Sequence, residues 1–233
     1  MKKRSLKEVR AKLDEYIAKV IELEQELKDL EHCRYYRVSI WGSKRMTFES
    51  KYGQITYQIA KRLAWEGIDI VTGGGPGLME AATRGAKEGQ REAQSKAKAV
   101  GLHIQGGYAS NSYLDIKRTH PKFTSRLEEF FRMSMVFIVM PGGIGTLLEL
   151  FYAWQLLQEF SKTKQPMILV GTEFWRGLLD WMRNSPLALG LIDEKDMKIV
   201  HLTDSVDEVV SIVLQDYNRW QEGCRLFFES ETS

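Results

Sequence analysis

The chain has 233 residues, of which 43% are hydrophobic, so it can bury a sizeable core in one large domain or two small ones. Its 33 Lys and Arg residues nearly balance 31 Asp and Glu residues, and the net charge of +2 argues against a general nucleic-acid or membrane-surface binder. The longest apolar run, residues 135–140, is about a third of a membrane-spanning helix. We therefore expect a cytoplasmic protein with neither nucleic acid nor membrane as partner, and expect Cys33 and Cys224 to be free thiols.

Residues 1–34 carry apolar residues at alternating spacings of three and four, which predicts an amphipathic helix with one narrow apolar seam. The seam consists of Leu6, Val9, Leu13, Tyr16, Val20, Leu23, Leu27 and Leu30. The spacing is compatible both with packing on the chain's own body and with a coiled coil between subunits. Because β-branched Val9 and Val20 alternate with leucines in a heptad, we predict pairing between subunits.

From residue 35 onward, short apolar runs alternate with longer amphipathic stretches. The expected strands are residues 37–41, 68–72, 97–104, 135–140, 167–170 and 198–201. The expected helices are residues 47–66, 77–89, 124–133, 146–161, 174–183 and 205–221. This alternation predicts an α/β fold, a doubly wound and mostly parallel sheet with helices on both faces. We expect one domain over residues 35–223, the helical extension 1–34 before it, and a C-terminal tail over 224–233.

Three expected strands end in glycine-containing segments, at the sheet edge where ligands bind in parallel folds. These segments are residues 41–45, residues 72–77 and residues 141–146. Neither longer turn matches G-x-G-x-x-G or G-x-x-x-x-G-K-[ST], which lowers support for a dinucleotide dehydrogenase or a P-loop NTPase. One such turn is as readily a helix cap, but two at one edge predict a cleft for a single phosphorylated ligand.

Two charged residues beside these segments suggest chemistry. Glu149 follows Thr146 by three positions, so its carboxylate either forms a capping box with Thr146 or faces the cleft. Arg126 either pairs with Glu129 on the surface, which the sequence alone favours, or reaches over the cleft. The four histidines lack ligand spacing, so no metal site is expected.

The strings GGGPGLMEA over residues 73–81 and PGGIGTLLE over residues 141–149 resemble the LONELY GUY (LOG) family of nucleoside-monophosphate phosphoribohydrolases, whose members have often been labelled lysine decarboxylases. The second string is highly specific, and the resemblance spans about residues 36–215. It implies a Rossmann-like fold and hydrolysis of AMP, or of a cytokinin-type N6-substituted AMP, to free base and ribose 5-phosphate. It also implies a homodimer with sites near the subunit interface. Nothing argues for a pyridoxal-phosphate lysine, and no cofactor is expected.

The resemblance also implies roles for individual residues. Arg126 and Glu149 align with the family's catalytic pair. The phosphate-binding positions are Gly142, Gly143, Gly145 and Thr146, and the nucleotide-binding positions are Gly42, Ser43, Gly74, Gly75 and Met79. This chain has Leu127 after Arg126, where the family commonly has lysine. Retention of Arg126 and Glu149 favours the enzyme, whereas the missing lysine favours a carrier that binds a nucleotide or nucleotide-like cofactor without cleaving it.

Overall fold

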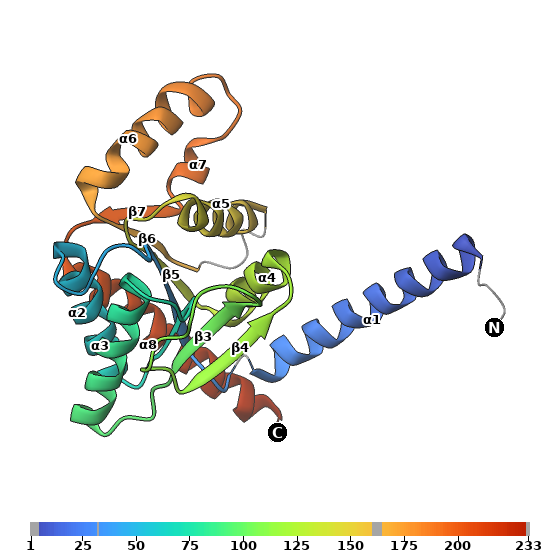
Figure 1. Ribbon diagram of the computed structural model, residues 1–233, viewed down its shortest axis with the longest axis horizontal. Helices are drawn as coiled ribbons and strands as arrows, with labels where there is room; N and C mark the ends of the chain where they lie inside the picture. Colours follow the sequence, from blue (N-terminus) through green and yellow to red (C-terminus); the bar gives the residue numbers. More distant parts are fainter. Residues whose placement is uncertain (1–4, 32, 160–164, 232–233) are drawn as a thin grey trace. The chain divides into compact units, whose positions relative to one another are not determined.

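The computed structural model describes the backbone of residues 5–31, 33–159 and 165–231, and the side chains of residues 5–23, 33–159 and 165–225. The chain divides into two compact units, Met1–Tyr35 and Tyr36–Ser233, and Figure 1 shows the elements of each. Within the described ranges, no helix is both long enough and apolar enough to cross a membrane.

The first unit contains one long helix, α1 (Leu6–Glu31). A capping box begins it, because the Glu8 amide donates to Ser5 Oγ (3.3 Å) and the Ser5 amide donates to Glu8 Oε2 (2.7 Å). The seam side chains from Leu6 to Leu23 are 49–84% exposed. The last two members of the seam, Leu27 and Leu30, lie outside the described side chains. Pairing of this seam between subunits stays a prediction.

The second unit is built on a seven-stranded sheet whose order is β4-β3-β2-β1-β5-β6-β7, with every neighbouring pair parallel. The strands are β1 (Arg37–Trp41), β2 (Asp69–Thr72), β3 (Ala99–Ile104), β4 (Ile116–His120), β5 (Val136–Val139), β6 (Met167–Val170) and β7 (Val200–Thr203). The chain moves outward from β1 to β4 and then returns to place β5 beside β1. This reversal confirms the expected doubly wound sheet.

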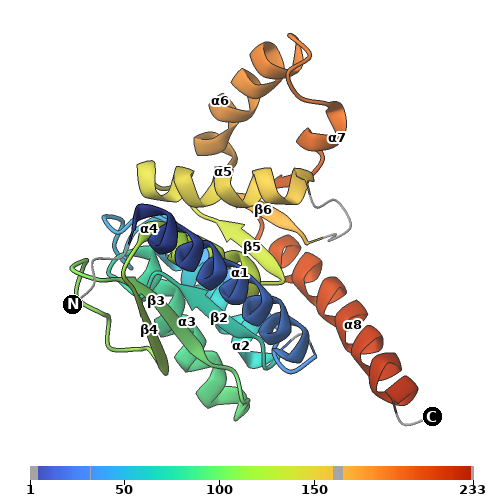
Figure 2. The ribbon, with the colours of Figure 1, turned by 90° about the vertical axis from the view of Figure 1, so that its right-hand side faces the viewer.

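Helices cover both faces of the sheet, as Figures 1 and 2 show. Alternate strand residues point to opposite faces, so Ile138 packs with α2, α3 and α8, whereas Phe137 and Val139 pack with α4, α5 and α6. The helices are α2 (Lys51–Trp65), α3 (Leu78–Ala93), α4 (Phe123–Met133), α5 (Ile144–Glu159), α6 (Thr172–Met182), α7 (Glu194–Met197) and α8 (Val206–Glu231), with a π-helical turn, η1 (Arg183–Leu187), after α6.

Several elements differ from the sequence expectations. Strand β4 was not expected, because Ile116–His120 lies at the sheet edge, is mostly exposed and lacks an apolar run. Helix α2 begins at Lys51 rather than at residue 47, since Ser50 Oγ accepts a hydrogen bond from the Gly53 amide (3.0 Å) and caps the helix there. The short elements η1 and α7 were also not expected, because each spans too few residues to show a periodicity.

Two further expectations fail near the ends of the chain. Residues 224–231 continue helix α8 rather than forming a separate tail, since no helix-stopping residue other than the isolated Gly223 interrupts the segment. The expectation that Cys33 and Cys224 are free thiols is also wrong, because both are disulfide-bonded.

Candidate functional site

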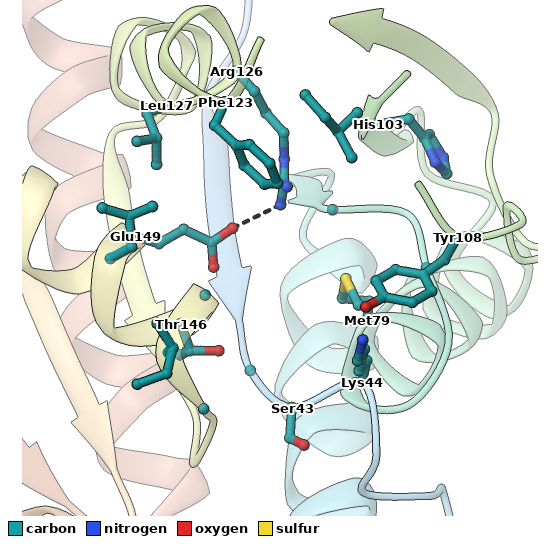
Figure 3. Close-up of a pocket in the computed structure, with 18 of the residues that line it drawn as sticks. Ser43, Lys44, Met79, His103, Tyr108, Phe123, Arg126, Leu127, Thr146 and Glu149 are labelled. Atoms are coloured by element: carbon teal, nitrogen blue, oxygen red, sulfur yellow. Dashed lines mark hydrogen bonds and ion pairs between the residues drawn. The ribbon is translucent and has the colours of Figure 1, made fainter. Parts of the chain in front are cut away.

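A pocket of about 540 Å³ lies at the carboxyl ends of β1, β2, β3 and β5. This volume is typical of small-molecule sites, which span about 300–1,000 Å³. Figure 3 shows side chains reaching it from the segment after β1 and from the helices α3, α4 and α5. Because the strand order reverses between β1 and β5, the pocket occupies the position where open parallel sheets bind their ligands.

The segment after β1 joins the two glycine-rich turns. The Ser43 amide donates to the carbonyl oxygen of Pro141 (3.0 Å), and the Ser43 carbonyl oxygen accepts from the Leu78 amide at the start of α3 (3.0 Å). Residues of both turns, including Gly75 and Gly143, line the same pocket. The two turns therefore form one wall.

The turn after β5 leads directly into helix α5. The helix begins at Ile144, so Gly145 and Thr146 lie in its first turn, and the Leu147 amide donates to the Gly143 carbonyl oxygen (3.0 Å). Earlier first-turn amides have no carbonyl partner within a helix, and together with the helix dipole they favour an anion. A capping box between Thr146 and Glu149 is wrong, because Thr146 lies inside the helix and not at its N-cap.

Arg126 and Glu149 meet in the pocket. Arg126 Nη2 lies 2.7 Å from Glu149 Oε1, and their side chains are only 15% and 12% exposed (Figure 3). Arg126 is therefore not the surface partner of Glu129 that the sequence alone favoured. The two residues are 23 positions apart in the chain, and the α4–β5–α5 connection brings them together.

The environment of this ion pair shifts the acidity of the carboxylate. Burial raises the pKa of Glu149 to about 7, while the positive charge of Arg126 acts in the opposite direction. A carboxyl group with a pKa near neutrality can take up or release a proton under physiological conditions. Arg126 Nε is buried and has no hydrogen-bond partner within the described part of the chain.

A cluster around Glu129 holds helix α4, which carries Arg126. Glu129 Oε2 lies 2.7 Å from His120 Nε2, and Glu129 Oε1 lies 3.4 Å from Arg132 Nη2 and also pairs with Arg118 Nη1. Arg118 and His120 belong to β4, the strand that the sequence did not predict. The edge strand therefore helps to position Arg126.

Most expected site residues line the pocket, but Gly74 and Gly142 do not. The position that a Cβ would take on Gly74 is occupied, because it would lie 2.3 Å from His103 Nε2. A Cβ on Gly142 would likewise have no room, because it would lie 2.2 Å from Thr146 Oγ1. Both glycines thus lie against residues that line the pocket, and the roles that the resemblance implies for them stay predictions.

Sequence reasoning assigned no role to several pocket residues, among them Lys44, His103, Tyr108 and Phe123. Lys44 Nζ lies 3.7 Å from the centre of the Tyr108 ring. Burial, with the positive charges of Lys117 and Arg126, lowers the pKa of His103 and favours its neutral form. Lys44 belongs to the segment that the sequence singled out after the first strand, although no role was assigned to it, whereas no pattern marks Tyr108 in its long loop.

The arrangement offers an acidic group of shifted pKa, the three cations Lys44, Arg45 and Arg126, helix-terminus amides and aromatic surface. Among the described residues, no group of three or more His, Cys, Asp or Glu side chains is arranged to hold a metal ion. The chemistry available from these residues is proton transfer, stabilisation of a developing cation by a carboxylate, and binding of a phosphorylated molecule.

The sequence is similar to curated nucleosidases. It is 31% identical over 140 residues to the pyrimidine/purine nucleotide 5'-monophosphate nucleosidase of Escherichia coli strain K12, an alignment covering 58% of this chain and 30% of that protein. The chain thus matches less than a third of the length of this relative.

Solved structures share the fold. A structural-genomics X-ray structure is 26% identical, with a TM-score of 0.57 over 77% of this chain and 99% of the other. A molybdenum cofactor binding protein from Rippkaea orientalis is 21% identical, with a TM-score of 0.57 over 78% of this chain and 97% of the other. At that identity, the second likeness shows the fold alone.

The family described as "Possible lysine decarboxylase" matches residues 79–213, which is more than half of the chain. The match includes helix α4 with Arg126, the turn after β5, and Glu149. The chain therefore belongs to this family, the LOG family, as the sequence resemblance indicated.

Proposed function

We propose that this protein is a hydrolase that cleaves the N-glycosidic bond of a nucleoside 5'-monophosphate, AMP or an N6-substituted AMP, to free base and ribose 5-phosphate. The observation that carries the proposal is the 2.7 Å ion pair between Arg126 and Glu149 in a pocket lined by the turn after β5. One pocket thus contains a group suited to the reacting carbon and a turn suited to a phosphate.

The reaction breaks the bond between C1' of the ribose and a nitrogen of the base. Water supplies a hydroxyl group to C1', and the base leaves with a proton. The transition state resembles an oxocarbenium ion, so the Glu149 carboxylate beside C1' stabilises positive charge, aligns the ribose hydroxyls or takes a proton from water. A pKa near 7 suits the last role, because the same group can accept and return a proton near neutral pH.

Arg126 has two roles in this proposal. Its Nη2 holds Glu149 in place, and its guanidinium, which lines the pocket, can donate to the leaving base. Donation to the base stabilises the negative charge that develops as the C–N bond breaks.

The phosphate would bind at Gly142, Gly143, Gly145 and Thr146. Gly42, Ser43, Gly74, Gly75 and Met79 would hold the rest of the nucleotide. Anchoring a remote phosphate orients C1' against Glu149, so binding energy is used to align the reacting atoms. The similarity to a nucleotide 5'-monophosphate nucleosidase supports this substrate class.

The second candidate is a carrier that binds a nucleotide or nucleotide-like cofactor without cleaving it. The observation that favours it is Leu127, which is 8% exposed and places an apolar side chain on the pocket wall where the family commonly has a cation. In either case we propose a homo-oligomer, a dimer or larger.

A panel of nucleoside monophosphates, scored for free base by chromatography, tests the proposal. We expect base release from AMP or an N6-substituted AMP, and a kcat/KM for adenosine lower by about 100-fold, because adenosine lacks the anchoring phosphate. Binding of AMP without release of base from any member of the panel would support the carrier. Equal kcat/KM for adenosine and AMP would contradict the assignment of the turn after β5 to phosphate.

A further inference from the structure

Lys44 is a positively charged residue of the pocket lining that takes no part in the ion pair between Arg126 and Glu149. Its Nζ lies 3.7 Å from the centre of the Tyr108 ring, and both side chains line the pocket (Figure 3). The ring face attracts the ammonium group and holds it at the pocket wall. Within the described part of the chain, Lys44 has no carboxylate at ion-pair distance, so its charge is not neutralised as that of Arg126 is.

The charged lining of the pocket is unbalanced in favour of an anion. Lys44, Arg45 and Arg126 line it, and Glu149 is the single acidic residue among its described lining residues. Three cations against one carboxylate leave an excess of two positive charges, which matches a phosphate monoester of nearly two negative charges at neutral pH. Because the charge of Arg126 is paired with that of Glu149, the cations whose charge is left for a phosphate are those of the segment after β1.

Lys44 lies beside the turn proposed to bind phosphate. Its neighbour Ser43 donates from its amide to Pro141, the residue that precedes the turn (3.0 Å). The Lys44 backbone is thus fixed next to the turn, while its flexible four-carbon stem allows the ammonium to move from the Tyr108 ring towards an anion there.

We propose that Lys44 is the specificity-determining cation of this pocket, contacting the 5'-phosphate of the ligand held at the turn after β5. It takes the place of the lysine that is replaced by Leu127 on α4. The inference rests on the proposed nucleotide ligand, but not on hydrolysis. Its consequence is that discrimination between nucleotides and nucleosides depends on the segment after β1.

Calorimetric titration of the full chain with AMP and with adenosine tests this assignment. For Lys44→Met we expect the affinity for AMP to fall by about tenfold or more, as for loss of one charge-assisted contact, with the affinity for adenosine within about twofold. Lys44→Arg retains the charge and should keep the AMP affinity within about threefold. The matched control is Lys51→Met, because Lys51 Nζ also lies over a tyrosine ring, 5.6 Å from the centre of Tyr52, but outside the pocket lining.

The possible outcomes separate this proposal from the proposed function. An unchanged AMP affinity in Lys44→Met overturns the role of Lys44, and so does an equal loss for AMP and adenosine. If the unmodified protein binds AMP but releases no base, hydrolysis is wrong while the result for Lys44 stands. If it binds no AMP, both proposals are wrong.

Discussion

The two glycine-rich turns, residues 73–77 after β2 and residues 142–146 after β5, have similar compositions and different surroundings. In the first turn, a Cβ on Gly77 would lie 2.5 Å from the Lys44 carbonyl carbon, and φ of Gly77 is +72°. In the second turn, a Cβ on Gly143 or Gly145 would have no neighbour within 4 Å, although both residues line the pocket.

This difference shows that glycine occurs in the two turns for two different reasons. At Gly77 the fold itself requires the absence of a side chain, because neighbouring backbone fills the space and the conformation is left-handed. At Gly145 the fold requires nothing, since the space beside it is open to the pocket. An open glycine in a pocket wall leaves room for a ligand to approach the backbone, so the turn after β5 is the better candidate for phosphate.

The largest effect on activity is expected at Glu149, which follows the glycine-rich turn after β5. Glu149→Gln should lower base release by about 10²- to 10⁴-fold, because the amide can neither carry negative charge nor accept the proton. Chromatographic assay of free base measures it, and circular dichroism checks that the fold is retained. The control is Glu128→Gln, which changes an exposed carboxylate on α4. Wild-type turnover in Glu149→Gln would rule out a role for this group in catalysis.

In the turn after β2, where Gly77 has no room for a side chain, a substitution should lower the stability of the protein. Gly77→Ala is expected to lower the free energy of unfolding by about 3 kcal/mol, from backbone strain and from steric overlap with Lys44. Urea denaturation measures the loss. Gly67→Ala is the matched control, since φ of Gly67 is +84° but nothing lies within 4 Å of its Cβ position, so only the strain of about 1 kcal/mol remains. Equal losses in the two variants would mean that packing at Gly77 contributes nothing.

The raised pKa of Glu149 should appear in the pH dependence of stability. Folding raises the pKa from 4.5 to about 7, so its stabilising contribution is fully present below about pH 4.5 and is lost as pH rises through 7. Glu149→Gln has no such dependence. The stability of Glu149→Gln relative to the unmodified protein should therefore increase by about 2 kcal/mol between about pH 5.5 and 8.5. Thermal unfolding at both pH values measures it, and a constant difference would show that the carboxyl group titrates normally.

In the turn after β5, where the space beside Gly145 is open, a substitution should weaken ligand binding without lowering stability. Gly145→Ala places a methyl group in the pocket, and we expect it to weaken AMP binding by about tenfold while stabilising α5 by about 0.5–1 kcal/mol. The control is Gly177→Ala in α6, where space is also open but which is not among the lining residues of this pocket, so only the helix is stabilised. Calorimetry and urea denaturation measure the two quantities. Unchanged affinity for AMP would mean that the open space is not used by the ligand.

The smallest effect on the site is expected from the first unit, which contributes to neither turn. Leu13→Lys with Val20→Lys should lower the oligomeric mass in sedimentation, because it places charges in the exposed seam of α1, and base release should remain. Ala11→Lys with Ala18→Lys changes the same helix outside the seam and serves as the control. An unchanged mass with lowered thermal stability would indicate that the seam packs on its own chain.

Hydrophobic patterning predicted the layered fold because buried parallel strands have continuous apolar sequences, as Val136–Val139 and Met167–Val170 do. It could not predict β4, whose residues Ile116–His120 meet solvent at the sheet edge. Both glycine-rich turns and Glu149 could be singled out from the sequence, but the partner of Arg126 could not. Pairing with the adjacent Glu129 or the distant Glu149 depends on how α4 crosses the sheet, and this is a tertiary property. The same holds for the contact of Lys44 with Tyr108.

The attachment of α4 to β4 through Glu129 has a consequence for how the pocket opens. Edge strands bond to one neighbour only, so they exchange their amide hydrogens through local opening more readily than central strands do. Arg118 and His120, which contact Glu129, belong to the strand that pairs only with β3, so we expect local opening of this edge to disturb the contacts that hold α4. The wall that carries Arg126 is therefore tied to the outermost strand of the sheet, while the glycine-rich turns are fixed to its centre. We therefore expect fluctuations of the sheet edge to displace the Arg126 guanidinium more than the glycine-rich turns.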